Sequence, residues 1–272
     1  MPNSISQQIQ ENYRVDALVD RVQQVLEQAG LGSGRLPWSD LAPLDQFHVR
    51  GLEASKELAD ALNVKEGQSL LDVGSGLGGP ARYLAAVHRI HVTGIDLTPA
   101  FIEVSNYLSH RAGLGHKLTF RQGDATDLPF ADETFDLAWT QHVAMNIQDK
   151  AKLYQGVHRV LKTNGRFAIY DPIKGNNQPI LYPTPWAPDE SISFVSTEED
   201  MKEALAAAGF KTISLVDKTA VSAEWFQHQR AQPPNPLSLP AILGPELGAA
   251  VANFARNLME GRVRLVQIIA DK

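Results

Sequence analysis

The chain has 272 residues, 43% of them hydrophobic, and a formal net charge of −6 at pH 7, so it holds enough apolar sequence to bury a full core. Because it has no cysteine, disulfides, thiolate zinc sites and a cysteine nucleophile are excluded. The acidic balance, without a cluster of basic residues, argues against a nucleic acid as partner.

Two helices and a connector are expected in the first part of the chain. Residues 4 to 29 carry apolar side chains near one face, with Ser4 as the N-cap, and predict the first helix. A connector that contains proline follows from Leu36 to Pro43, and residues 52 to 62 predict a second amphipathic helix. Residues 1–62 are therefore expected to form a helical cap.

From residue 69 onward, strand-like and helix-like segments alternate, which is typical of an α/β fold with a buried, mostly parallel sheet. The expected crossover helices are Pro80 to Val87, Pro99 to Ala112 and Asp149 to Leu161. The expected strands are Ser69 to Val73, His91 to Ile95, Leu118 to Gln122, Phe135 to Thr140 and Arg166 to Tyr170.

Two further strands, Thr212 to Val216 and Val263 to Ala270, complete a predicted sheet of seven strands. A helix between residues 197 and 208 has Ser196 as its cap and Glu199 three positions later, which indicates a capping box. The proline-rich stretches are interpreted as loops over the sheet. We expect a single domain with its core at 63–171, a lid at 172–195 after the fifth strand, loops at 179–188 and 233–240, and the rest of the sheet at 196–272.

The run from Leu70 to Leu84 is the most informative stretch, because a buried strand breaks into glycines and then at once into a helix. Gly74, Gly76 and Gly78 allow tight-turn backbone angles and a close approach to a bound nucleoside. In a doubly wound sheet, ligands bind at the carboxyl ends of the strands. The turn therefore predicts a ligand site at the end of the first strand.

Two cofactors are compatible with this turn. Residues 74 to 79 satisfy the pattern G-x-G-x-x-G, and Asp96 follows at the distance expected of a dinucleotide-binding fold, which favours NAD. Asp72 favours another ligand, because a carboxylate just before the turn would face a pyrophosphate badly but would suit a cationic amine. S-adenosylmethionine carries such an amine.

Five segments in order carry a resemblance to a known family: Leu70 to Gly78, Gly94 to Leu97, Gly123 to Ala125, Phe135 to Trp139 and Val160 to Arg166. Together they resemble the class I S-adenosylmethionine-dependent methyltransferases, in the small-molecule group of ubiquinone/menaquinone, tocopherol and sarcosine/dimethylglycine methyltransferases. The last segment departs from the family pattern, with Thr163 for proline and Asn164 for glycine. Asparagine tolerates the left-handed conformation, so the turn is expected to survive.

The resemblance implies a Rossmann-like sheet and S-adenosylmethionine as cofactor. Asp96 would accept hydrogen bonds from both ribose hydroxyls, Asp124 would accept from the adenine amino group, and Asp72 would lie near the methionine amino group. The alternative for a single aspartate after a strand is a plain turn former. The predicted cofactor-binding residues are Asp72, Gly74, Ser75, Gly76, Gly78, Asp96, Leu97, Asp124, Ala125 and Gln141.

Methyl transfer is an in-line displacement, so the protein mainly aligns the nucleophile, the methyl carbon and the sulfur. A base is needed only if the nucleophile must lose a proton. His142, directly after the fourth strand, is the candidate base, and Asn146 is a candidate hydrogen-bonding anchor. The alternative is that His142 only makes hydrogen bonds within the fold.

Substrate contacts are expected from two other segments. His48 and Arg50 could meet the cofactor carboxylate or an acidic substrate, although Arg50 is more simply interpreted as a solvated surface residue. Aromatic side chains of the lid suit an apolar ring or a cationic amine, or else only pack the loop: Tyr182, Trp186 and Phe194.

The sequence thus predicts an enzyme that uses S-adenosylmethionine to methylate oxygen, nitrogen or carbon of a small molecule. The alternatives are an NAD-dependent oxidoreductase and a cofactor-binding protein without catalysis. No metal is expected, because no His, Asp and Glu cluster has ligand spacing. With no apolar run of about 18 residues and no signal-peptide pattern, a cytoplasmic protein without a membrane span is expected, and a homo-oligomer is left open.

Overall fold

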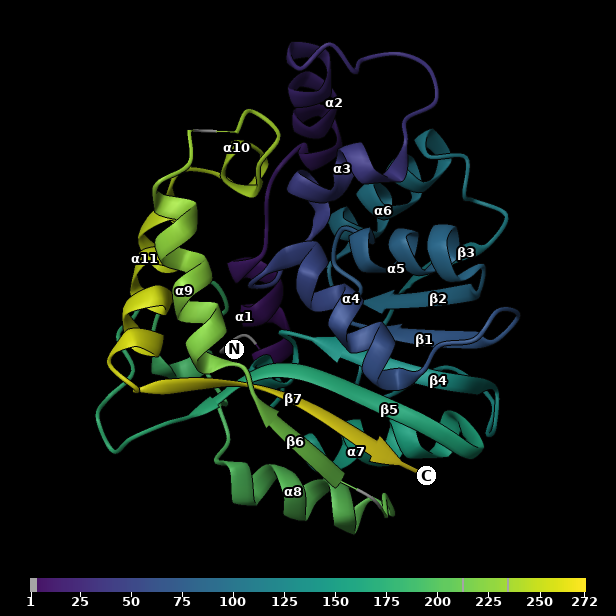
Figure 1. Cartoon of the computed structure of the whole chain (residues 1–272), viewed down its shortest axis with the longest axis vertical. Coiled ribbons are helices and arrows are strands. Elements are labelled where there is room, and N and C mark those ends of the chain that lie inside the picture. Colours follow the sequence, from purple (N-terminus) through teal and green to yellow (C-terminus); the bar gives the residue numbers. More distant parts are fainter. Residues whose placement is uncertain (1–3, 212, 234) are drawn as a thin grey trace.

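The computed structural model describes residues 4–211, 213–233 and 235–272, and its centre is a sheet of seven strands in the order β3-β2-β1-β4-β5-β7-β6 (Figure 1). The first five strands pair in parallel, whereas β7 is antiparallel to both β5 and β6. The α/β, doubly wound prediction is confirmed. The strands are β1 (Ser69–Val73), β2 (His91–Asp96), β3 (Leu118–Gln122), β4 (Phe135–Gln141), β5 (Leu161–Lys174), β6 (Ile213–Asp217) and β7 (Val263–Asp271).

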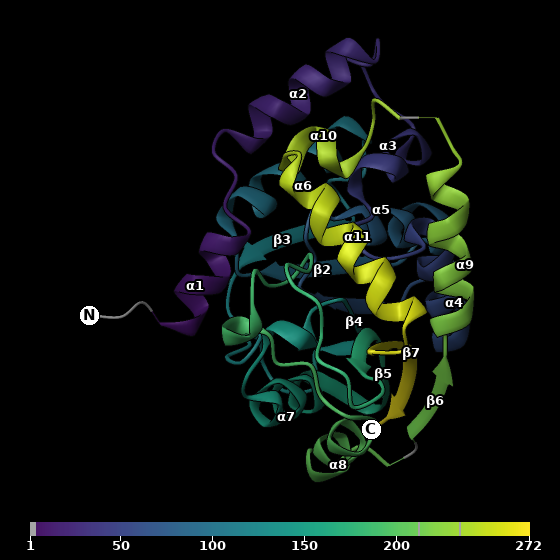
Figure 2. The ribbon, with the colours of Figure 1, turned by 90° about the vertical axis from the view of Figure 1, so that its left-hand side faces the viewer.

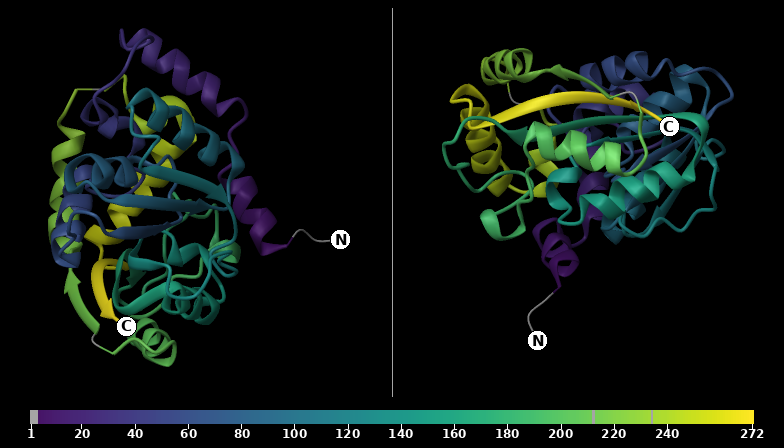
Figure 3. Two further views of the ribbon diagram at one scale, coloured as in Figure 1. Left: turned by 90° about the vertical axis from the view of Figure 1, so that its right-hand side faces the viewer. Right: turned by 90° about the horizontal axis from the view of Figure 1, so that it is seen from below.

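Helices cover both faces of the sheet (Figure 3). Leu70 of β1 belongs to a core cluster shared with helices α4 and α11, whereas Leu71 and Val73 belong to a second cluster shared with α7 and α8. Burial on both faces explains the continuous apolar run of β1. The main helices on the two faces are α4 (Gly51–Leu62), α5 (Gly79–Tyr83), α6 (Pro99–Arg111), α7 (Lys150–Val160), α8 (Glu198–Ala207), α9 (Thr219–Arg230) and α11 (Glu246–Met259).

The strand predictions agree with the structure to within a residue or two, except at β5. This strand runs from Leu161 to Lys174, so it begins before the predicted Arg166 and ends after the predicted Tyr170. It begins earlier because Leu161 pairs with Phe135 of β4, and it ends later because it pairs with β7 up to Lys174. The irregular segment therefore begins at Gly175 rather than at residue 172. Asn164 has φ 65°, so the left-handed turn expected there is confirmed. Thr212, the predicted start of β6, lies outside the described residues.

The single helix predicted over residues 4 to 29 is wrong. The structure has α1 (Ile5–Asn12), capped by Ser4 as expected, and α2 (Leu18–Gln28), with Ala17 between them at φ 53° (Figure 2). Tyr13 stands at the break, where its ring packs against Phe47 and Phe101 with centroids 6.1 and 6.0 Å apart. We attribute the break to this tertiary packing, which outweighs continuous helical periodicity.

The connector from Leu36 to Pro43 also differs from the prediction, because a helix, α3 (Trp38–Asp45), forms there with Pro43 inside it. Leu41 and Leu44 of this helix are fully buried, and their burial offsets the hydrogen bond that proline cannot make. Sequence reasoning gave the proline more weight than the two leucines.

The capping box of α8 lies one residue later than predicted, at Thr197 and Asp200 rather than Ser196 and Glu199. The reason is that the carbonyl oxygen of Ser196 accepts a hydrogen bond from the N–H of Lys174 at 2.8 Å. This bond keeps Ser196 beside the end of β5, so the helix can begin only after it.

Helices α9, α10 (Leu239–Leu243) and α11 lie between β6 and β7, where no helix was predicted. The stretch from 233 to 240 is thus only in part a loop, since α10 begins at Leu239. Helices α9 and α11 contact each other and lie side by side along one edge of the molecule in Figure 1. Among the described residues, no helix is both long and apolar enough to pass through a membrane.

Candidate active site

The turn after β1 is formed by glycines in left-handed conformations. Gly74 has φ +73°, and a Cβ placed there would collide with the side chain of Val143. Gly76 has φ +51° and nothing within 4 Å of such a Cβ, and its N–H donates to Asp96 Oδ2 at 2.9 Å. The glycine turn is therefore tied to the end of β2 and leaves open space above it.

Gly78 and Gly79, at the end of the glycine turn, serve packing. Gly78, predicted to bind the cofactor, lies outside the lining of the cavity described below, and a Cβ there would come within 2.8 Å of the Phe120 ring. A Cβ at Gly79 would collide with the carboxylate and backbone of Asp45. Contacts within the fold account for Gly79, the third glycine of G-x-G-x-x-G, and because that glycine also serves packing in dinucleotide-binding folds, it does not distinguish the two cofactors.

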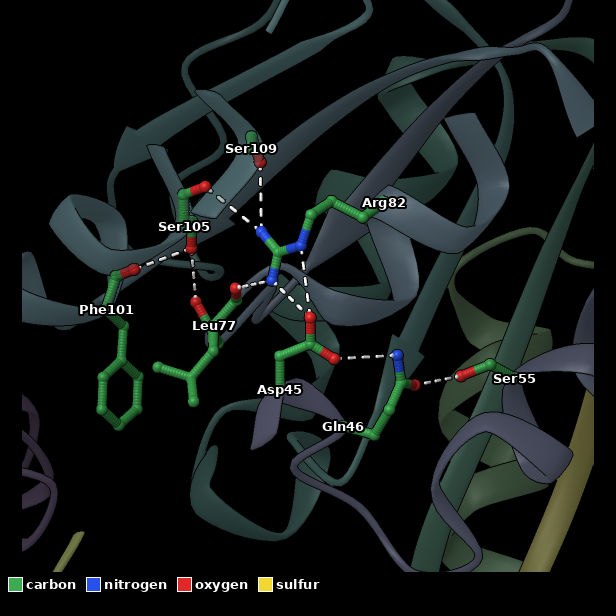
Figure 4. A network of polar contacts seen from close by, with 9 residues as sticks. Asp45, Gln46, Ser55, Leu77, Arg82, Phe101, Ser105 and Ser109 are labelled. Carbon is green, nitrogen blue, oxygen red and sulfur yellow. Dashed lines mark hydrogen bonds and ion pairs between the residues drawn. The ribbon is translucent and has the colours of Figure 1, made fainter. Parts of the chain in front are cut away.

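A buried ion pair supports the turn from behind (Figure 4). Arg82 Nη2 donates to Asp45 Oδ2 at 2.8 Å and to the carbonyl oxygen of Leu77 at 2.5 Å. Arg82 Nη1 donates to Ser109 Oγ at 3.1 Å. Burial raises the pKa of Asp45, and the Arg82 charge opposes that rise. Sequence reasoning missed this network, because residues 45 and 82 lie in different helices and no local pattern links them.

A cavity of about 290 Å³ opens at the carboxyl ends of β1 to β4. Every predicted cofactor-binding residue except Gly78 lines it, as do the candidate catalytic residues His142 and Asn146. Of the predicted substrate residues, His48 and Trp186 line it, whereas Tyr182 does not. The lining also includes residues that were not predicted: Ile5, Ser6, Ile9, Tyr13, Phe47, Thr98, Phe101, Met145, Gln148 and Pro185.

Three carboxylates stand at successive strand ends in this cavity. Burial raises the pKa of Asp72 to about 7 and also raises the pKa of Asp96. Asp96 accepts from the N–H groups of Gly76 and Thr98, both at 2.9 Å. Asp124 accepts from the N–H of Thr126 at 2.8 Å. These backbone bonds fix two of the carboxylates, and Asp72 is fixed by its place inside β1.

Several buried polar atoms of the lining have no hydrogen-bond partner within the described structure. They are Asp72 Oδ2, Ser75 Oγ, both amide atoms of Gln141 and Nε2 of His142. A buried polar atom without a partner costs roughly 1–3 kcal/mol, so such atoms seldom occur together without a purpose. Their convergence on one cavity indicates a polar ligand that supplies the missing partners.

His142 is held in a fixed orientation after β4. Its backbone has φ 56°, its N–H donates to the Tyr170 carbonyl at 2.8 Å, and its ring stacks on the Tyr170 ring at 5.4 Å. The next two N–H groups, of Val143 and Ala144, donate to Asp171 at 2.7 and 3.1 Å. Burial lowers the pKa of His142 well below its ordinary value, so the ring is neutral at pH 7.

The other predicted side chains on this side are already engaged. His48 Nε2 lies 2.9 Å from the Gly51 carbonyl oxygen, and burial lowers the His48 pKa to about 4. Arg50 is buried and paired with Glu57, so its interpretation as a solvated surface residue is wrong, and it does not line the cavity. Asn146 Nδ2 donates to the backbone carbonyl oxygen of Trp186 at 2.8 Å.

Helix α1 covers the outer side of the cavity. Gln10 Nε2 donates to the Leu97 carbonyl oxygen at 2.8 Å, and Ser6 Oγ lies 3.4 Å from Asp124 Oδ2. Tyr13 Oη donates to Asn146 Oδ1 at 3.0 Å. These contacts join residues that are about a hundred positions apart in the chain, so local sequence patterns carried no signal for them.

Comparison with known proteins identifies the core of the chain. Residues 71–169 match the family described as "Methyltransferase domain". Residues 71–169 thus form a methyltransferase domain. The match covers the strands that carry the glycine turn, Asp96, Asp124 and His142. Within the described residues, no group of three or more His, Cys, Asp and Glu side chains is placed to hold a metal ion.

Relatives of this methyltransferase domain differ in the acceptor that their names give. Phosphoethanolamine N-methyltransferase 3 of Arabidopsis thaliana is 33% identical over 175 residues, which are 62% of this chain and 34% of that protein. Erythromycin 3''-O-methyltransferase of Saccharopolyspora erythraea is 34% identical over 122 residues, 44% of this chain and 40% of that protein. The chain spans about a third of the length of the plant relatives it matches.

Solved structures share the fold of this domain. Phosphoethanolamine N-methyltransferase 2 of Haemonchus contortus, solved with phosphomonomethylethanolamine and S-adenosylhomocysteine, has a TM-score of 0.74 at 18% identity, covering 99% of this chain and 61% of that one. Geranyl diphosphate C-methyltransferase of Streptomyces coelicolor A3(2), solved with Mg²⁺, geranyl diphosphate and S-adenosylhomocysteine, has a TM-score of 0.72 at 17% identity, covering 99% and 98%.

Proposed function

We propose that this protein transfers a methyl group from S-adenosylmethionine to a small molecule bound in the same cavity. The observation that carries the proposal is the set of buried, unpartnered polar atoms of Asp72, Ser75 and Gln141 around the glycine turn. A ligand with a cationic amine, a carboxylate and ribose hydroxyls supplies donors and acceptors for such a set.

Each part of the cofactor has a proposed partner. Asp72 would hold the methionine amine, and Gly74, Ser75, Gly76 and Gln141 would lie against the methionine end. Asp96 would accept from the ribose hydroxyls, since each of its oxygens keeps a free lone pair beside one backbone bond. The adenine would lie against Leu97, Asp124 and Ala125, which also line the cavity.

The chemistry needs little from the protein beyond alignment. The bound sulfonium supplies an electrophilic methyl carbon, and the protein has to present a nucleophile in line with it. His142 is the proposed base for a nucleophile that carries a proton. Asn146 would help to position the walls of the cavity rather than react, because its side chain already bonds to Tyr13 and to the Trp186 carbonyl oxygen.

The first test is a calorimetric titration of the purified chain with S-adenosylmethionine, S-adenosylhomocysteine and NAD in parallel. We expect micromolar dissociation constants for the first two ligands and no binding of NAD. Asp72 argues against the dinucleotide alternative, because its carboxylate lines the cavity and would face a pyrophosphate badly. Binding of NAD alone would overturn the proposal, and binding without turnover of any acceptor would leave a cofactor-binding protein.

The remaining sequence predictions stay with this proposal. A net charge of −6 supports a partner that is a small molecule rather than a nucleic acid. A cytoplasmic location and a homo-oligomer remain predictions, which cell fractionation and light scattering would test.

A further inference from the structure

Three cations on the segments that form the cavity are used within the fold. Arg82 donates to the Asp45 carboxylate and to the Leu77 carbonyl oxygen (Figure 4). Arg50 Nη1 donates to Glu57 at 2.9 Å, and Lys150 Nζ donates to two backbone carbonyl oxygens at 2.9 and 2.5 Å. In the part of the chain that the structure describes, no lysine or arginine lines the cavity. An anionic group on an acceptor would therefore meet no free cation there.

Carboxylates line the same cavity and would repel such a group. Asp72, Asp96 and Asp124 stand at the strand ends, whereas Asp149 at the rim is paired with Lys152 Nζ at 3.2 Å and adds little net charge. A charge pair a few ångströms apart interacts by several kcal/mol at an effective dielectric of about 20. The cavity thus favours a neutral or cationic acceptor over one that carries a phosphate or carboxylate, whereas the carboxylate of the proposed cofactor is accompanied by its own amine and sulfonium charges.

Part of the cavity lining is aromatic and apolar. Met145 and Trp186 are buried there, and the Trp186 ring packs edge-on against Phe254 at 4.9 Å. Phe47 and Pro185 complete this surface. Apolar walls with a few placed polar groups are the usual lining for an apolar small molecule.

Next to this apolar surface lies one polar atom without a hydrogen-bond partner, Nε2 of His142, whose ring packs against Phe254 at 5.8 Å. His142 Nε2 is buried and unpartnered, while the ring is held by its stack on Tyr170. The neighbouring His48 is already bonded to the Gly51 carbonyl oxygen, so it does not compete for a ligand. A neutral imidazole nitrogen can pair with a hydroxyl group without any net charge entering the site.

We propose that the acceptor is an uncharged, largely apolar alcohol or phenol whose hydroxyl group pairs with Nε2 of His142. This inference rests on the proposed function and narrows its substrate. In the transfer, the bond between sulfur and the methyl carbon breaks and sulfur keeps the electron pair. The hydroxyl oxygen forms the new bond to carbon, and its proton passes to His142 Nε2. The products are a methyl ether, S-adenosylhomocysteine and a protonated His142, whose positive charge replaces that of the sulfonium, so atoms and charge balance.

The test uses probes with one carbon skeleton and different charges: geraniol, geranate and geranyl diphosphate. Each is titrated by calorimetry into the full chain saturated with S-adenosylhomocysteine. We expect geraniol to bind at least about 10-fold more tightly than either anion. Equal or tighter binding of an anion would overturn the inference. Failure of S-adenosylhomocysteine to bind in the first step would instead contradict the proposed function.

A charge variant separates electrostatics from shape. Gln148 is an exposed residue of the lining, so Gln148→Lys adds a cation at little cost to the fold. In this variant, the ratio of the dissociation constant for geranyl diphosphate to that for geraniol is expected to fall by roughly 3-fold or more. An unchanged preference would contradict charge as its cause.

The reacting atom is tested by turnover. With S-adenosylmethionine present, geraniol should yield geranyl methyl ether and S-adenosylhomocysteine in equal amounts by mass spectrometry. Geranylamine is the matched nitrogen acceptor. A higher kcat/KM for geranylamine than for geraniol would overturn the assignment to oxygen.

Discussion

Asp72 couples the affinity for a cationic ligand to pH, because burial raises its pKa to about 7. Below that pH the carboxyl is protonated and neutral, and above it the carboxylate can pair with the methionine amine. We expect the association constant for S-adenosylmethionine to rise about 10-fold between pH 6 and pH 8. Calorimetry across this range checks the slope, and Asp72→Asn should abolish it; a slope that survives in the variant would exclude Asp72 as its origin.

The same residue affects stability with a defined sign. The pKa of Asp72 is higher in the folded chain than in the unfolded one, so the folded state binds more protons between about pH 4 and pH 7. The contribution of Asp72 to the free energy of unfolding therefore falls as pH rises through that range. Without cofactor, Asp72→Asn should raise the melting temperature at pH 8 and lose that advantage near pH 4. An equal shift at both values would contradict the linkage.

His142 distinguishes base catalysis from simple packing. If its imidazole removes the acceptor proton, His142→Gln should lower kcat about 100-fold or more. The dissociation constant for S-adenosylhomocysteine should change little, because other residues are proposed to hold the cofactor. Steady-state kinetics beside calorimetry gives both numbers. Normal turnover in the variant would leave His142 as a residue that only supports the fold.

At the scale of elements, Tyr13, at the end of α1, ties this helix to the wall of the cavity by a hydrogen bond between side chains. Tyr13→Phe removes the donor to Asn146 Oδ1 at 3.0 Å and leaves that oxygen buried without a donor. We expect the affinity for S-adenosylhomocysteine to fall by about 1 kcal/mol, roughly 5-fold. The control is Arg14→Ala in the same segment, whose exposed pair with Asp16 faces solvent. Equal effects of both variants would contradict a specific role for the Tyr13 contact.

At the scale of the whole molecule, the Arg82 network joins four helices around the glycine turn (Figure 4). Arg82→Leu leaves the buried Asp45 carboxylate without its partner and should lower the free energy of unfolding by about 3–5 kcal/mol. Arg89→Leu is the control, because its pair with Glu66 is exposed and contributes less than about 1 kcal/mol. Urea denaturation of both variants checks the difference, and similar losses would contradict a structural role for the buried pair.

Strands were predictable because their signal is local. A buried parallel strand reads as a short apolar run, and β1 and β3 have the bounds that were expected from such runs alone. The helices between β6 and β7 were missed although α11 has a local signal of its own, with Ala250, Phe254 and Leu258 buried at helical spacing. The break at Tyr13 and the helix through Pro43 were missed for a different reason, since contacts with distant residues decided against the local pattern.

By itself, the sequence determined the sheet, the glycine turn and the aspartates at the strand ends, because glycines and strand ends act through the backbone of their own segment. Only the tertiary structure decided which of these residues meet. It showed that Gly78 and Gly79 serve packing, that Arg50 and Asn146 are already bonded, and that His142 has a free, buried nitrogen. Partners that lie tens of residues apart come together only when helices pack on the sheet, so no local pattern records them.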